Sequence, residues 1–169
     1  MGTLVDARGR GPRLRANCQA LCLLLCFALM SGLAAAGQAA APRLIVGEPW
    51  VRGTVEGQTG SGAYMRLTSR EDLRIVGASS PAANKVEIHE MRMVDNRMTM
   101  RAVPSLALPA NATVALEHGY HIMLIGLSQR LEVGQTVKIT LHLIDAKGMP
   151  FDFDVLAPVR ALNASSRRE

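Results

Sequence analysis

From residue 44 to residue 159 the chain is a series of short apolar runs separated by turn residues. Val137, Ile139 and Leu141 alternate with polar residues, which is typical of a strand with one buried face and one face in water. No window shows a convincing helical period over ten or more residues. The runs predicted to be strands are residues 44–48, 50–54, 63–69, 73–78, 86–93, 97–103, 105–108, 112–117, 121–127, 135–143 and 151–156.

Many short strands within about 115 residues predict an all-β fold, a single Greek-key β-sandwich. The predicted sandwich domain covers residues 44–159, after a linker at 37–43 and before a polar tail at 160–169. Residues 57–62 are predicted to be a loop, and residues 80–85 could form a single helical turn. Trp50 is expected to fill the core of the sandwich, and the alternative is that it packs beside a site formed by the histidines and methionines. His142, on the polar side of its strand, is expected to be solvated.

The first 36 residues have the order of a secretory signal peptide. Four arginines between Arg8 and Arg15 precede an almost wholly apolar stretch at residues 20–33, and small residues follow it. The apolar stretch has about 14 residues, whereas a membrane-spanning helix needs about 20, so a signal peptide is favoured over an uncleaved anchor. We expect cleavage after Ala36 or after Ala40, export to the periplasm, and no membrane span in the exported chain.

All three cysteines, Cys18, Cys22 and Cys26, lie in this leader, and no cysteine suited to lipid attachment follows the small residues. The exported chain is therefore expected to have no disulfide, no thiolate ligand and no lipid anchor. The formal net charge of +5 comes from 19 basic and 14 acidic residues, and the leader holds four of the basic and one of the acidic residues. The remainder is nearly neutral, so nucleic acid is not predicted as a partner.

Residues 86–127 contain three of the four histidines and five of the nine methionines. Side chains at i and i+2 of a strand share a face, which groups His89 with Met91 and Met93, Met98 with Met100, and His121 with Met123. A two-residue hairpin loop at Asp95 and Asn96 would place Met93 opposite Met98 and Met91 opposite Met100. His121 and Met123 have to come from a neighbouring strand or loop. His118, in a turn-like sequence, is expected to be exposed.

Thioethers and imidazoles without thiolates favour a soft metal ion, with Cu(I) as the first candidate. Zinc takes cysteine, histidine or carboxylate, and thioether is a poor ligand for it. The alternative is that the methionines fill gaps in the core and that the histidines are solvated or hydrogen-bonded in place. The sequence has no nucleophile–base constellation, no His-Glu-x-x-His and no Gly-rich phosphate loop, so enzymatic activity is not predicted.

The spacing resembles the signature of the periplasmic copper chaperones of the PCu(A)C family, H(M)-x10-M-x21-H-x-M. Ten residues separate His89 from Met100, and His121 and Met123 supply the H-x-M. The interval between Met100 and His121 is twenty residues rather than twenty-one, which leaves Met91 and Met98 as alternative ligands. Similar blocks at residues 49–52, 63–65, 86–91 and 119–124 extend the resemblance over about residues 44–159.

The resemblance implies a cupredoxin-like β-sandwich that binds one Cu(I) through His89, Met100, His121 and Met123. It implies delivery of copper to the dinuclear copper centre of cytochrome c oxidase. The implied partners are the copper-bearing subunit of that oxidase and thioredoxin-like assembly factors. Two alternatives stay open. The first is a periplasmic copper scavenger or buffer that uses the same ligands, for uptake or resistance. The second is a metal-free β-sandwich interaction module.

Overall fold

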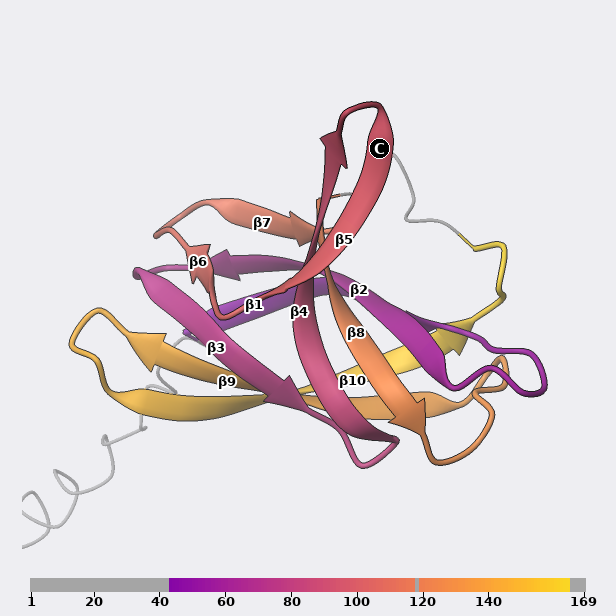
Figure 1. Ribbon diagram of the computed structural model, residues 1–169. Helices are drawn as coiled ribbons and strands as arrows, with labels where there is room; N and C mark the ends of the chain where they lie inside the picture. The colour runs from indigo at the N-terminus through magenta and orange to yellow at the C-terminus, as the bar shows by residue number, and fades with distance from the viewer. Residues whose placement is uncertain (1–42, 118, 165–169) are drawn as a thin grey trace, which may run out of the picture. The chain divides into compact units, whose positions relative to one another are not determined.

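The computed structural model describes residues 43–117 and 119–164, and these residues fold into strands and turns without a helix (Figure 1). The predicted leader, most of the linker, His118 and residues 165–169 lie outside the described residues. No helix in the described part of the chain is long and apolar enough to cross a membrane. The strands are β1 (Leu44–Arg52), β2 (Gly60–Ser69), β3 (Leu73–Ser79), β4 (Ala83–Val94), β5 (Arg97–Val103), β6 (Leu106–Leu108), β7 (Thr113–Leu116), β8 (Tyr120–Leu127), β9 (Thr136–Asp145) and β10 (Pro150–Arg160).

The strands are hydrogen-bonded in the order β5-β4-β8-β2-β1-β10-β9-β3-β6, and β7 also pairs with β2. The pair β1–β10 is parallel and joins the two halves of this path, whereas the other strand pairs are antiparallel. Apolar side chains from both halves pack into one buried cluster. The fold-class prediction of an all-β domain is therefore confirmed.

One face of the first half lines this core. Val51, Ala63, Ile122 and Ile88 come from the adjacent strands β1, β2, β8 and β4, and each is at most 2% exposed. Because side chains alternate along a strand, the residues next to these four point to the opposite, outer face of the sheet. The predicted ligands lie on that outer face.

Two local predictions differ from the structure. The two strands expected on either side of Pro49 are one strand, β1, with a bulge between Gly47 and Trp50. Glu48 takes a positive φ of 48° there, and the proline lacks a backbone N–H for the ladder, so the bulge accommodates both without ending the strand. The predicted loop at 57–62 ends earlier, because β2 already begins at Gly60.

The β4–β5 hairpin has the predicted register. Val94 pairs with Arg97 across a two-residue turn in which Asp95 and Asn96 have φ of 48° and 59°. Positive φ at both turn residues is the requirement of a type I′ hairpin, and asparagine tolerates it well. The hairpin extends beyond the other strands (Figure 1). Residues 81–82 form a turn before β4 begins at Ala83, without the helical turn considered from sequence.

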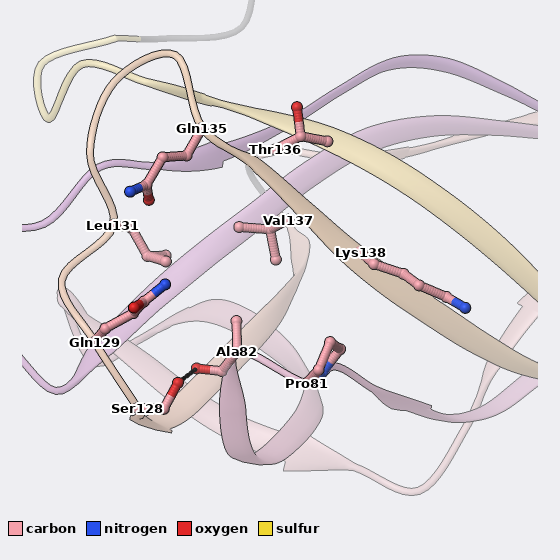
Figure 2. A pocket seen from close by; sticks show the side chains of 9 residues that line it. All are labelled: Pro81, Ala82, Ser128, Gln129, Leu131, Gln135, Thr136, Val137 and Lys138. Carbon is pink, nitrogen blue, oxygen red and sulfur yellow. Dashed lines mark hydrogen bonds between the residues drawn. The ribbon is translucent and has the colours of Figure 1, made fainter.

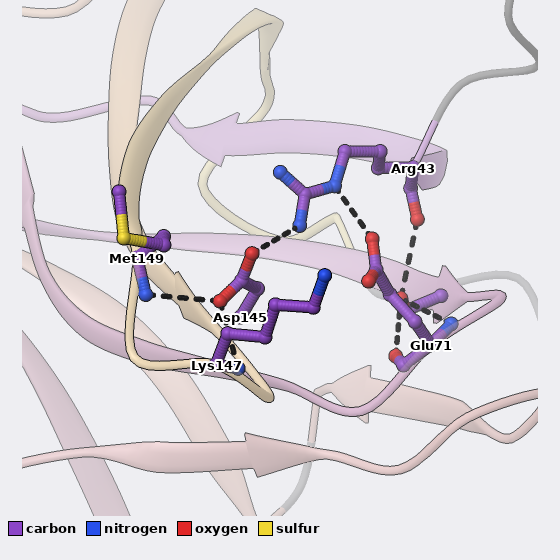
Figure 3. A network of polar contacts seen from close by, with 6 residues as sticks. Arg43, Glu71, Asp145, Lys147 and Met149 are labelled. Atoms are coloured by element: carbon purple, nitrogen blue, oxygen red, sulfur yellow. Dashed lines mark hydrogen bonds and ion pairs between the residues drawn. The ribbon is translucent and has the colours of Figure 1, made fainter.

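A polar network fastens the start of β1 to turns of both halves of the fold (Figure 3). Arg43 donates from Nε to Glu71 and, over 3.0 Å, from Nη2 to Oδ2 of Asp145. Asp145 also accepts backbone N–H bonds from Lys147 and Met149, each over 2.9 Å. The N–H of Met149 first, and then Arg43, hold the pKa of Asp145 below its ordinary value. The network thus ties the β2–β3 and β9–β10 turns to the beginning of the domain.

Candidate metal centre

The rings of Trp50, Tyr64, His121 and His89 form a row across the outer face of the sheet, which we call the histidine row. Trp50 of β1 pairs with Tyr64 of β2, and His89 of β4 pairs with His121 of β8. The ring centroids are 4.4 Å apart for Trp50 and Tyr64, 6.1 Å for Tyr64 and His121, and 5.7 Å for His121 and His89. The structure therefore brings together the two histidines that the sequence places 32 positions apart.

Trp50 is buried, with 2% exposure, but it does not join the aliphatic cluster between the sheets. Its ring stacks on Tyr64 with an interplanar angle of 23°, and the guanidinium of Arg160 lies 5.5 Å from its centroid. The expected burial is observed, but it occurs on the face that carries the histidines. Trp50 therefore supports the histidine row through Tyr64.

His89 is held in one tautomer by a carboxylate. Its Nε2 lies 2.9 Å from Oε2 of Glu87, which can only accept, so Nε2 carries the proton and donates. In the neutral ring the lone pair is then on Nδ1, which is buried and has no hydrogen-bond partner. This hydrogen bond first, and then the ammonium of Lys85, lower the pKa of Glu87. Glu87 thus stays ionised and keeps Nδ1 of His89 free to bind a ligand.

His121 is neutral at physiological pH because of its surroundings. Its side chain is 3% exposed in total, and burial is the main cause that lowers its pKa to about 4. Repulsion from His89 in its protonated form, and then from the guanidinium of Arg52, lowers the pKa of His121 further. Its Nδ1 is also buried without a hydrogen-bond partner. A neutral imidazole with a free lone pair is the form that binds a metal ion.

Whether a metal ion fits between His89 and His121 can be judged from their two Nδ1 atoms. A buried polar atom without a partner is costly, so each one requires an explanation. The chain provides no donor for either atom in the described residues. No group of three or more His, Cys, Asp or Glu side chains suited to a metal occurs there either. A soft cation bound by both nitrogens and by nearby thioethers would satisfy both atoms.

Met123 lies beside the histidine pair on the same face. It follows His121 by two positions on β8 and pairs with Glu87 on one side and with Gly62 on the other. A Cβ atom at Gly60 would be 3.2 Å from Cε of Met123, and one at Gly62 would be 2.6 Å from Oη of Tyr64. The two glycines therefore leave room for the methionine and for the tyrosine ring.

Met100 and Met91 lie on the other side of the histidine pair. They face each other across β4 and β5, and the N–H of Met91 donates to the carbonyl of Gly119 over 2.7 Å. Met100 is thus one diagonal step from His89, whereas Met91 is one diagonal step from His121, at about 7–8 Å between Cα atoms. Both are within reach of the pair, so the choice of Met100 as ligand stays a prediction.

Met98 lies one row further out, opposite Met93, near the turn of the hairpin. Both side chains are 62% exposed, compared with 52% for Met100. Met98 is therefore less suited than Met91 to replace Met100. His142, the histidine outside this region, is bound to Asp152 and Ser79 on the other half of the fold.

Glu90 fixes the base of the hairpin from the opposite face. Its carboxylate accepts hydrogen bonds from Nε and Nη2 of Arg101, at 3.1 and 2.9 Å, and from the hydroxyl of Tyr120 at 3.0 Å. Arg92 lies 2.8 Å away. Arg101 is the main cause that keeps the pKa of Glu90 below its ordinary value. Since Glu90 is only 5% exposed, these donors hold an ionised carboxylate between β4, β5 and β8.

Sequence reasoning missed Glu87, Tyr64 and Arg52 as residues of the site. Glu87 could have been found, because it precedes His89 by two positions and so shares its face. Tyr64 and Arg52 could not, because their strands reach the histidines only through long-range pairing.

An open pocket lies beside the start of β4 and the end of β8, away from the histidine pair (Figure 2). Its side chains come from the turn before β4, the segment after β8 and the start of β9. The hydroxyl of Ser128 donates to the carbonyl of Ala82, and Lys138 forms an ion pair with Asp154 over 2.8 Å. Lys138 is the one charged side chain that lines the pocket. The pocket therefore lacks converging groups that would recognise a charged ligand.

Comparisons with solved structures place the fold among copper-protein domains. The solution structure of CuI-DR1885 from Deinococcus radiodurans is 33% identical, with a TM-score of 0.54 over 78% of this chain and 87% of that one. The copper-bound PCuAC domain from PmoF2 is 23% identical, with a TM-score of 0.56 over 72% of this chain and 96% of that domain. The predicted fold of the PCuAC type is confirmed.

Sequence comparisons identify the family. The chain matches the family described as "Putative lipoprotein LpqE-like" over residues 44–155. It is 32% identical over 123 residues to "Putative lipoprotein Lxx21020" from Leifsonia xyli subsp. xyli (strain CTCB07), a match that covers 72% of each chain. Together these matches show that the chain belongs to the LpqE-like family.

Proposed function

We propose that the protein is an exported copper chaperone that binds one Cu(I) through His89, Met100, His121 and Met123. The observation that carries the proposal is the cross-strand pair of His89 and His121, in which both Nδ1 atoms are buried without a partner. Thioethers lie on both sides of this pair on the same face. The name of CuI-DR1885, a solved relative at 33% identity, is consistent with copper as the ligand.

The ligand set suits binding and release better than catalysis. Thioether sulfur and neutral imidazole are uncharged, soft or intermediate ligands, which favour Cu(I) over hard cations. Glu87 orients one imidazole, and the low pKa of His121, about 4, keeps the other neutral. Met100 lies on the edge strand β5 and is 52% exposed, so an incoming ligand from a partner could displace its sulfur first.

Copper binding is tested by anaerobic titration of Cu(I) against a competing chelator. We expect one tightly bound Cu(I) in the wild type and none in a variant that combines His121→Ala with Met123→Leu. The matched control combines His142→Ala with Met149→Leu, which removes the same residue types from positions away from the pair. Equal affinity in the site variant and in the control would contradict the proposed site.

Delivery is the finer part of the proposal, and it rests on the resemblance to the PCu(A)C chaperones. The proposed recipient is the dinuclear copper centre of cytochrome c oxidase, with thioredoxin-like assembly factors as further partners. The apo copper-bearing subunit of the oxidase, mixed with the Cu(I)-loaded protein, should acquire copper. A failure to transfer would favour a copper buffer, and a failure to bind copper at all would favour a metal-free interaction module.

We also propose that the leader at residues 1–36 directs export to the periplasm and is removed. The intact mass of the exported protein should correspond to cleavage after Ala36 or after Ala40. The names of the family and of its Leifsonia relative point to lipoproteins, and the alternative is a lipid on Cys18, Cys22 or Cys26. A mass that includes an acylated cysteine would contradict the removal of the whole leader.

A further inference from the structure

The β4–β5 hairpin carries two successive pairs of thioethers on one face. Met91 lies opposite Met100, and Met93 lies opposite Met98 one row closer to the turn. Directly opposite side chains have Cβ atoms about 4.5–5.5 Å apart, close enough for two flexible thioethers to reach one ion. We refer to these four side chains, Met91, Met93, Met98 and Met100, as the methionine ladder.

The outer pair of the ladder does not serve the core. Met93 and Met98 are each 62% exposed, so the usual role of methionine as a filler of internal gaps does not explain them. The opposite face of the hairpin is polar instead, and there Arg92 and Arg101 bind Glu90. The face with sulfur is therefore accessible to solvent and separate from the ionic face.

The ladder is continuous with the proposed copper site. Successive side chains on one face of a strand are about 6.5–7 Å apart, so the outer pair lies one such step from the inner pair. The inner pair in turn lies one diagonal step from the histidines. A soft cation bound at the turn of the hairpin would thus have thioether ligands along the whole path to His89.

We propose that Met93 and Met98 form a second Cu(I) site, which captures copper from solution and passes it along the methionine ladder to the histidine pair. This inference rests on the proposed function, because it assigns an entry route to that site. Two exposed neutral sulfurs without an imidazole bind Cu(I) more weakly than the full site, which makes the transfer favourable. Each step exchanges thioether ligands on Cu(I), with no change of oxidation state and no proton transfer.

The test is a titration with Cu(I) under anaerobic conditions, followed through the methyl resonances of the methionines in labelled full-length protein. Cu(I) is diamagnetic, so a bound thioether shifts its methyl signal without losing it. We expect the first equivalent to shift Met123 and the second to shift Met93 and Met98. The combined variant Met93→Leu and Met98→Leu should lose the second equivalent and keep the first.

Met149 provides the matched control, because it is 61% exposed but lies in the turn between β9 and β10. Its methyl signal should not move during either equivalent. Equal shifts of Met149, Met93 and Met98 would show unspecific binding to any exposed thioether and would overturn the inference. The inference also fails if the wild type binds a single equivalent and Met93 and Met98 do not respond.

The two proposals fail in different ways. If the first equivalent leaves Met123 unshifted while Met93 and Met98 respond, the site at the histidine pair is wrong and the site on the hairpin stands. Should the double variant fold poorly, as judged from its amide spectrum, the single variant Met98→Leu serves the same purpose. Because Met98 is exposed, this variant should keep the wild-type fold and lose the second equivalent.

Discussion

The histidine row and the methionine ladder occupy the same outer face of one sheet, but they differ in burial. His121 is 3% exposed and stacks beside Tyr64, which in turn stacks on Trp50. Met93 and Met98 are each 62% exposed and pair with each other across β4 and β5. Packing therefore fixes the nitrogens, whereas the sulfurs of the hairpin can move.

This difference separates the two tasks that a copper carrier must combine. A fixed pair of neutral imidazoles provides a site that is ready for the ion, because little reorganisation is needed on binding. Exposed thioethers on an edge strand give the ion a way in and out. Each variant below changes one of the two regions, and the other region serves as the reference.

The largest effect is expected from the histidine row. The combination of His121→Ala and Met123→Leu removes two proposed ligands, and the affinity for Cu(I) should fall by more than about 100-fold, beyond the usual cost of losing a residue that only orients a ligand. The measurement is competition with a Cu(I) chelator. A loss of less than about tenfold, below the range for such orienting residues, would place the copper elsewhere.

The second prediction concerns the folding stability of the copper-free protein in acid. In the unfolded chain the pKa of His121 has its ordinary value of 6.5, and in the folded protein it is lowered to about 4. Between these values the unfolded state binds a proton that the folded state does not, so stability is complete above pH 6.5 and falls as the pH decreases toward 4. The free energy of unfolding should decrease by at most about 3 kcal/mol through this histidine.

Urea unfolding at pH 7 and pH 4.5 measures this loss. The variant His121→Gln should lose less stability than the wild type over the same interval, because it lacks the titrating ring. Variants of the methionine ladder, which has no titrating group, should show the wild-type dependence. An identical dependence in His121→Gln would contradict the role of this histidine.

The third prediction concerns Glu87, whose substitution should weaken Cu(I) binding without removing a ligand. In Glu87→Gln the amide can no longer force the proton onto Nε2 of His89, so part of the population has Nδ1 protonated and unable to bind. The Cu(I) affinity should fall by about tenfold, the lower end of the range for residues that orient a metal ligand. The matched control is Glu132→Gln, which changes the same side chain at an exposed position before β9.

The smallest effects are expected from single thioethers of the ladder. Met100→Leu and Met91→Leu should be compared, because the sequence selects Met100 while the structure places both within one diagonal step of a histidine. The variant that lowers the affinity of the first equivalent identifies the ligand. Met98→Leu should leave that affinity unchanged, and a loss in Met98→Leu alone would move the site toward the turn.

Features that depend on the alternation of side chains along a strand could be predicted from the sequence. The register of the β4–β5 hairpin follows from its turn residues and from the two-residue period, so the pairs Met91–Met100 and Met93–Met98 could be derived. The contact between His89 and His121 could not, because β4 and β8 meet through tertiary pairing. The bulge that places Trp50 beside Tyr64 depends on a positive φ at Glu48, which the sequence pattern did not indicate.

The central claim is that the buried histidine pair and thioethers of the same face hold one Cu(I) together. X-ray absorption at the copper edge of the anaerobically loaded protein, at one equivalent, tests it most directly. We predict two nitrogen and two sulfur neighbours, with one of the two nitrogen neighbours lost in His121→Ala. A shell of sulfur alone, or of nitrogen and oxygen without sulfur, would contradict the claim.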